Sequence, residues 1–213
     1  MALVASDIIT DVRQVLLDDD AVDWTNADML RFVTDAGRLL SNFKPDAYPV
    51  RDWVSMVVGT NQALPADGIA VLDMSQNYVS KRAATLVDKE LLDHENRFWQ
   101  ANTAEVDVQH WCADPRDPRR FDINPPNDGT GRVLMLYGAA PPVLTQLTDA
   151  IVYVDTYKYA LTCFTLHRAY AEQSRKGDNV KSQQWLQNGL QAIGIKSAAQ
   201  VQVAPKVTAN PGQ

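Results

Sequence analysis

The sequence predicts a mainly α protein with a β-rich insertion, an α+β fold in which a four-helix bundle carries a small antiparallel β region. Apolar residues recur every three to four positions near both ends of the chain, which is typical of helices with one buried face. Between them, apolar and polar residues alternate in short runs bounded by glycine and proline, which is typical of strands. The final segment, residues 196–213, has neither pattern, and we expect it to be an extended tail.

Residues 1–45 are expected to supply the first helix pair of the bundle. The acidic run Asp18–Asp20 ends the first helix. Thr25 is a favourable cap for the second, and Asp28 three residues later resembles a capping box. This second helix ends at Lys44, because the residue before a proline avoids the helical region. The expected buried residues are Ala5, Ile8, Ile9, Val12, Val15 and Leu16 in the first helix, and Met29, Leu30, Val33, Ala36, Leu40 and Phe43 in the second.

Residues 46–142 are expected to form the β-rich insertion. The alternating pattern predicts strands over 51–58, 62–64, 69–74, 106–110, 121–123 and 132–137. Asp88 is expected to cap a brief helix. Turns rich in glycine, proline, asparagine and aspartate separate the strands, and the pair Pro125-Pro126 is expected to end one of them.

Residues 143–195 are expected to form a helical hairpin that completes the bundle. The first helix has its apolar stripe on Val154, Tyr157, Leu161, Phe164 and Ala171. Gly177 ends it and Asp178 is a plausible cap for the next helix. The second helix has a narrow stripe on Trp185, Leu186, Gly189, Leu190 and Ile193, so it needs a neighbour, and its hairpin partner is the nearest. Adjacency then favours a bundle of the two terminal helix pairs.

Composition excludes several classes of protein. Of the 213 residues, 46% are hydrophobic and 22% are charged, which is ordinary for a globular domain with a real core. The net charge of −6 argues against a general nucleic-acid-binding surface, which needs clustered Lys and Arg. Two cysteines argue against a disulfide scaffold. With neither a signal-peptide pattern nor a long apolar run, we expect a soluble intracellular protein, or one assembled inside a cell, with no membrane partner.

Residues with catalytic or metal-binding potential do not form a recognisable site. Asp18–Asp20 with Asp23 resembles a calcium loop but lacks its glycine and closing glutamate, so a solvated acidic connection is the favoured interpretation. Four zinc ligands would be available if two distant segments met, namely Cys163 and His167 with His110 and Cys112, but we favour core or interface roles. No phosphate loop, nucleophile elbow or zinc-protease motif occurs. We therefore expect no catalytic residue, cofactor or metal, with a metal-assisted hydrolase as the alternative from another class.

One basic cluster, formed by Arg116, Arg119 and Arg120, stands out in an expected hairpin. The simpler interpretation is a charged tip that keeps an exposed strand edge from aggregating. The sharper one is a contact with acidic groups of a neighbouring subunit or tail protein, or with DNA phosphate.

Several motifs, in their order along the chain, resemble head–tail adaptor (connector) proteins of tailed bacteriophages, especially short-tailed ones. The resemblance spans about residues 6–193. The motifs are Trp24-Thr25 through Leu39-Leu40, Lys44-Pro45-Asp46-Ala47-Tyr48, Gly59-Thr60-Asn61-Gln62-Ala63-Leu64-Pro65, Asp117-Pro118-Arg119-Arg120-Phe121 with Asn124-Pro125-Pro126, Tyr137-Gly138-Ala139-Ala140-Pro141-Pro142, and Ala160-Leu161 through His167-Arg168-Ala169-Tyr170.

The resemblance implies a virion structural protein, made in the host bacterial cytoplasm and located in the neck. Such adaptors form a ring, usually dodecameric, between the portal protein and the tail nozzle or tail-tube protein, and double-stranded DNA passes through without specific binding. The tail commonly docks on the portal, which here points to Lys196, Val201, Val203, Pro205 and Val207. A neck stopper or tail-tube subunit is the alternative within the structural class.

Overall fold

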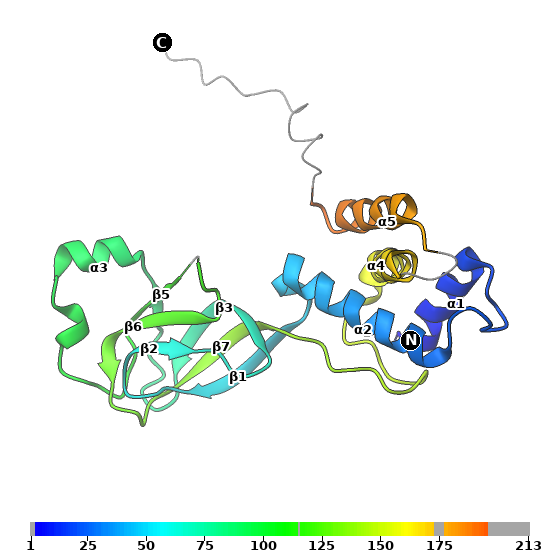
Figure 1. The fold of residues 1–213 in the computed structure, drawn as a ribbon. Coiled ribbons are helices and arrows are strands. Elements are labelled where there is room, and N and C mark those ends of the chain that lie inside the picture. Colours follow the sequence, from blue (N-terminus) through cyan, green and yellow to red (C-terminus); the bar gives the residue numbers. More distant parts are fainter. Residues whose placement is uncertain (1–2, 115, 173–176, 196–213) are drawn as a thin grey trace, which may run out of the picture. The chain divides into compact units, whose positions relative to one another are not determined.

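A computed structural model describes residues 3–114, 116–172 and 177–195, and it divides the chain into two compact units. The helical unit comprises Met1–Ala36 and Val143–Gln213, and the β unit comprises Gly37–Pro142. The described residues contain five α-helices and seven strands, and the strands form two sheets (Figure 1). None of the described helices is both long enough and apolar enough to cross a membrane.

The helical unit is built on α4, Lys158–Ala171. This helix contacts α1 (Ala5–Leu16) and α5 (Asn179–Ala192). An ion pair joins it to α2 (Asn26–Phe43), since Arg168 Nη2 lies 2.9 Å from Asp35 Oδ2. Eight residues of α4 are buried, and they lie on most of its circumference: Ala160, Leu161, Thr162, Cys163, Phe164, Thr165, Leu166 and Ala169. Helix α4 is therefore the central helix of this unit.

Helix α5 is an outer helix that packs closely on α4. Only Ser182 and Gly189 are buried along it. A Cβ atom at Gly189 would overlap the ring of Phe164, so this position requires the absence of a side chain. Asp178 caps the helix as expected, because its carboxylate accepts hydrogen bonds from the N–H groups of Val180 and Lys181.

The β unit contains a three-stranded and a four-stranded sheet. In the first, β7 (Arg132–Ala139) lies between β1 (Pro49–Ser55) and β3 (Gly68–Asn77), and both pairings are antiparallel. In the second, the order is β2 (Gly59–Ala63), β6 (Arg120–Asn127), β5 (His110–Ala113) and β4 (Thr85–Leu86), and only the β4–β5 pairing is parallel. The helix α3 (Lys89–Glu95) and the 3-10 turns η1 (Pro45–Ala47) and η2 (Trp99–Ala101) complete the unit.

An apolar core shared by the two sheets holds them together. Its buried members come from both sheets and include Met56, Met74, Trp111, Phe121, Ile123, Val133, Met135 and Tyr137. Buried polar side chains brace the loops around it. Asn127, which is fully buried, donates to the carbonyls of Glu105 and Val106 and accepts from the N–H groups of Gly129 and Gly131.

The predicted four-helix bundle with a small β region is wrong, because the chain has a β-rich α+β fold with two sheets. The prediction treated the helices as comparable partners with one buried stripe each. Burial is instead concentrated on α4, while α5 buries two residues. The β region was underestimated because β3 extends over ten residues and β6 continues through Pro125 and Pro126, which were expected to end it. The Pro126 carbonyl still accepts a hydrogen bond from the N–H of Glu105, so the strand stays paired there although proline has no N–H to donate.

Candidate interaction surfaces

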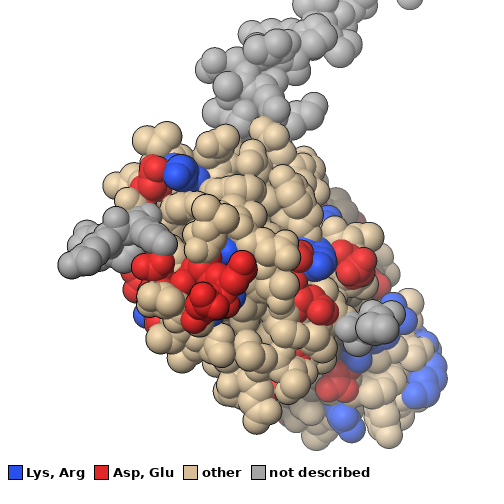
Figure 2. Space-filling view, turned by 90° about the vertical axis from the view of Figure 1, so that its right-hand side faces the viewer, with Lys and Arg blue, Asp and Glu red and all other residues tan. Residues whose placement is uncertain are grey.

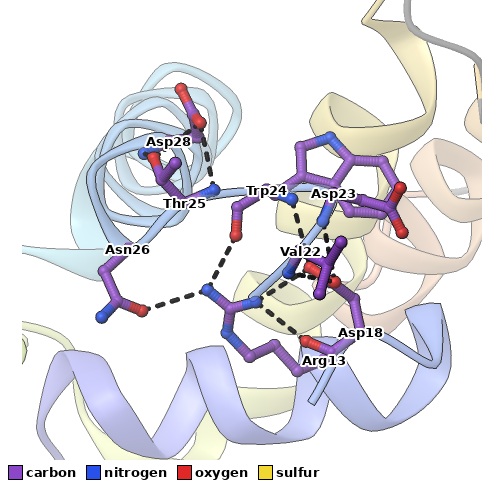
Figure 3. A network of polar contacts seen from close by, with 8 residues as sticks. All are labelled: Arg13, Asp18, Val22, Asp23, Trp24, Thr25, Asn26 and Asp28. Carbon is purple, nitrogen blue, oxygen red and sulfur yellow. Dashed lines mark hydrogen bonds and ion pairs between the residues drawn. The ribbon is translucent and has the colours of Figure 1, made fainter. Parts of the chain in front are cut away.

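The loop that joins α1 to α2, residues 17–25, folds around a buried ion pair (Figure 3). Arg13 Nη1 lies 2.9 Å from Asp18 Oδ2, and the two residues are 7% and 4% exposed. The same guanidinium donates to the carbonyls of Asp18 and Trp24, each at 2.9 Å, and to Asn26 Oδ1 at 3.0 Å. One side chain of α1 thus ties both ends of the loop to the start of α2.

The carboxylate of Asp18 binds the other side of the loop. It accepts hydrogen bonds from the N–H groups of Val22 at 2.8 Å, Asp23 at 3.0 Å and Trp24 at 3.2 Å. Burial acts to raise the pKa of Asp18, but these three N–H groups and the positive charge of Arg13 outweigh it, so the pKa lies below its ordinary value. The acidic run was expected to be a solvated connection, and this interpretation is wrong for Asp18.

The α1–α2 loop is pre-organised. Leu17 and Ala21 have φ angles of 55° and 56°, in the left-handed region that residues with a side chain rarely adopt. Such conformations persist where the surroundings fix them, and here the Arg13–Asp18 network does so. Thr25 and Asp28 form the expected capping box, with Asp28 N–H donating to Thr25 Oγ1 and Thr25 N–H donating to Asp28 Oδ2, each at 3.2 Å.

This rigid loop displays apolar side chains among carboxylates. Leu17 and Val22 are 85% and 81% exposed. Asp19, Asp20 and Asp23 are exposed beside them. Acidic side chains gather on the face of the helical unit that Figure 2 shows. Large exposed apolar residues on a fixed backbone are typical of a surface that another protein covers.

The β unit has a second exposed apolar surface where β1 and β3 end and β7 begins. The N–H of Tyr78 donates to the carbonyl of Arg132 at 2.8 Å, and that of Met56 donates to Gly131 at 2.9 Å, so the adjoining turns meet at one end of the sheet. We call the exposed apolar residues there the strand-end patch: Val57, Val58, Tyr78 and Val79, which are 59%, 75%, 45% and 74% exposed.

Two cations lie beside the strand-end patch and are held by aromatic rings. Lys81 Nζ lies 4.9 Å from the ring centroid of Tyr78 and 5.1 Å from that of Trp53, and the two rings meet edge to face at 5.0 Å. Arg132 Cζ lies 5.0 Å from the Tyr78 ring. Within the described residues neither cation has a carboxylate as an ion-pair partner. Cation–π contacts orient these charges without neutralising them.

The predicted arginine cluster is partly engaged within the β unit. Arg120 donates to Asn61 Oδ1 at 3.0 Å and lies 3.5 Å from a carboxylate oxygen of Asp117. Arg119 donates to the carbonyl of Ala66 at 3.3 Å. The side chain of Arg116 lines a hollow of about 760 Å³ between α3 and β5. All three are exposed, as a contact with another subunit requires.

The predicted zinc ligands divide between the two units. Cys163 and His167 lie on α4, where His167 Nδ1 is 3.0 Å from the Ser182 carbonyl and burial lowers the pKa of the imidazole. His110 and Cys112 lie on β5, and burial raises the pKa of the Cys112 thiol to about 11. Among the residues that the structure describes, no three His, Cys, Asp or Glu side chains are grouped to hold a metal ion.

The predicted portal-docking residues Lys196, Val201, Val203, Pro205 and Val207 lie outside the described residues. Sequence reasoning missed the Arg13–Asp18 network, although a signal was present: Arg13 is four residues after Ile9 and thus on the apolar stripe of α1. It also missed the strand-end patch, whose members come from two separate turns, one with Val57 and Val58 and one with Tyr78 and Val79.

A family model described as SU10 adaptor protein matches residues 5–210. A comparison with curated proteins finds no match.

Proposed function

Because this chain belongs to the SU10 adaptor protein family, we propose that it is a head–tail adaptor, a structural protein of the neck of a tailed bacteriophage. The observation that carries the proposal is the family match over residues 5–210, which includes both units and most of the tail. It agrees with the order of motifs from Trp24 to Tyr170 that resembles phage connectors. The short-tailed class of phage and synthesis in the host bacterial cytoplasm remain parts of this proposal.

The proposed assembly is a ring, dodecameric by resemblance, between the portal protein and the tail nozzle or tail-tube protein. Ring closure by rotation needs two different lateral surfaces on each subunit. The chain offers different exposed surfaces on its two units, namely the α1–α2 loop and the strand-end patch, which supports the proposal. The exposed arginines Arg116, Arg119 and Arg120 are proposed to contact a neighbouring subunit or tail protein.

We assign portal docking to residues 196–213, with Lys196, Val201, Val203, Pro205 and Val207 as the contacting residues. A modest affinity of one tail for the portal is multiplied when many copies bind one portal. Residues 196–213 can reach roughly 60 Å when extended. That length allows the folded part of each copy to stay in the ring while its tail reaches the portal.

The ring also serves as a conduit for the genome. Each copy has a net charge of −6, so a ring of identical copies has a negative total charge. Carboxylates along a channel repel phosphate and give none of the counterion release that makes DNA bind tightly. We therefore propose transient passage of double-stranded DNA without specific binding.

Deleting residues 196–213 tests the proposal. We expect the truncated chain to keep the circular dichroism spectrum and the unfolding midpoint of the full chain, and to lose co-sedimentation with the portal protein of the same phage. A variant with residues 196–213 in scrambled order controls for tail length. If truncated and scrambled chains still join the portal as the full chain does, the docking role of the tail is wrong. If the full chain joins only the tail tube, it is a neck stopper or tail-tube subunit.

A further inference from the structure

We propose that the α1–α2 loop of one copy docks on the strand-end patch of the next copy. This inference rests on the proposed function, since it names the contact between ring neighbours. Both surfaces are exposed within a single chain, with Leu17 and Val22 more than 80% exposed and Val58 and Val79 more than 70% exposed. Covering such residues removes apolar area from water, which favours association.

The two surfaces are complementary in charge. Three exposed carboxylates, Asp19, Asp20 and Asp23, surround the apolar residues of the loop. Two cations, Lys81 and Arg132, flank the apolar residues of the patch, and neither is paired with a carboxylate in the described part of the chain. A match of this kind steers two copies into one orientation and disfavours contacts between like surfaces. This complementarity identifies the partner as a second copy of this chain.

Both surfaces are fixed before they meet, which lowers the entropic cost of association. The Arg13–Asp18 network holds the loop, including the left-handed residues Leu17 and Ala21. On the patch, Lys81 is held by the rings of Trp53 and Tyr78. Tyrosine, tryptophan and arginine are also the side chains that contribute most to protein interfaces, and Tyr78 of the patch lies against Trp53 and Arg132.

The contact joins two different surfaces, so it is heterologous: each copy offers its loop to one neighbour and its patch to the other. A heterologous contact closes into a ring or extends as a chain of copies, whereas a contact between identical surfaces stops at a dimer. The proposal thus predicts which pairs of engineered cysteines meet between copies.

The test uses the full chain with Val22→Cys in one sample and Val79→Cys in another, assembled on the portal protein of the same phage. Both positions are exposed, and the natural Cys112 and Cys163 are buried. We expect a short bismaleimide cross-linker to join the two variants in a mixture, and to join neither variant to itself. The doubly substituted chain is expected to give a ladder of cross-linked oligomers. The control pairs Val22→Cys with Val180→Cys, since Val180 is 80% exposed on α5 and outside both surfaces.

A charge exchange gives a second readout. Replacing Lys81 and Arg132 by glutamate is expected to raise the apparent dissociation constant of assembly at least about tenfold. Replacing Asp19 and Asp20 by lysine in the same chain is expected to restore much of the lost affinity. A ring of normal mass without the cross-link between positions 22 and 79 overturns this inference and leaves the adaptor role intact. A Val22→Cys chain that cross-links to itself also overturns it. A chain that forms no oligomer with the portal contradicts the inference and the proposed function together.

Discussion

Replacing Asp18 by asparagine is expected to destabilise the helical unit strongly. The substitution keeps the shape of the side chain but removes its charge. In the native loop one carboxylate oxygen accepts from Val22 and Asp23, and the other accepts from Trp24 and Arg13. Asparagine has one oxygen, so its amide N–H₂ group must face either two backbone donors or the guanidinium and Trp24. In both orientations donors are left facing donors.

The expected loss is about 3–5 kcal/mol, which is typical when one partner of a buried ion pair is removed and the other charge stays buried. The side chains of Arg13 and Asp18 are 8% and 1% exposed, so water compensates little. Globular domains are stable by only about 5–15 kcal/mol. The substitution therefore removes a large share of the stability of the unit that contains α1.

Urea unfolding of the full chain at pH 7, followed by circular dichroism, measures this loss. The matched control is Asp19→Asn, the exposed neighbouring residue, for which we expect a change within about 0.5 kcal/mol. A loss below about 1 kcal/mol for Asp18→Asn, or equal losses for the two variants, would refute the claim that the network stabilises the loop.

The pH dependence provides an independent check. The pKa of Asp18 is lower in the folded chain than its ordinary value of 3.8. Folding therefore gains stability from this group above about pH 3.8, and the gain is lost as the pH falls toward the folded pKa. We expect the difference between wild type and Asp18→Asn to be constant from pH 6 to 7 and to shrink below about pH 4. A difference that is as large at acid pH contradicts the assigned role of the charge.

Three further predictions concern the interiors of the two units. Gly189→Ala is expected to lower the free energy of unfolding by about 1–3 kcal/mol, because the added Cβ overlaps the Phe164 ring. Thermal unfolding measures this loss, with Gln187→Ala at an exposed position as the control. Equal midpoints for the two variants would contradict the close α4–α5 contact. Asn127→Ala is expected to lower the free energy of unfolding in urea by at least about 2 kcal/mol, because the buried partners of Asn127 lose four hydrogen bonds. An unchanged midpoint would contradict the bracing of these loops by Asn127. Cys112 is buried and its pKa is raised to about 11, so we expect it to react with a thiol reagent at pH 8 only after denaturation. Rapid labelling of Cys112 in the native chain would contradict its burial.

Local signals in the sequence predicted most of the helices. The three-to-four spacing from Ala5 to Leu16 coincides with α1, because an amphipathic helix of that length needs only one apolar neighbour to bury its stripe. The caps at Asp88 and Asp178 also follow from neighbouring residues alone. In the two caps the hydrogen-bond partners lie two positions apart along the chain.

The sheets depend on partners far away in sequence, and the pattern did not predict them fully. Strand β3 pairs with β7 through three register shifts, and each shift interrupts the two-residue alternation by which a strand is recognised. Consecutive strands β6 and β7 lie in different sheets, although a turn at Asn127–Gly131 favours a simple hairpin. Topology of this kind follows from the common core, to which Phe121, Ile123, Val133 and Met135 all contribute.

The candidate surfaces were predictable only in part. The arginine cluster could be read from the sequence, because its members are adjacent. The strand-end patch could not, since turns after β1 and β3 and before β7 meet there only in the folded sheet. The acidic run could be seen in the sequence, but its division into the buried Asp18 and the exposed Asp19 and Asp20 depends on the position of Arg13 on α1.

The mass of the complex between this chain and the portal protein of the same phage tests the adaptor role most directly. Native mass spectrometry of the mixture is predicted to give one discrete species, with a portal ring and a fixed number of adaptor copies, twelve if the resemblance holds in full. A portal ring that keeps its own mass in the presence of excess full-length chain contradicts the account.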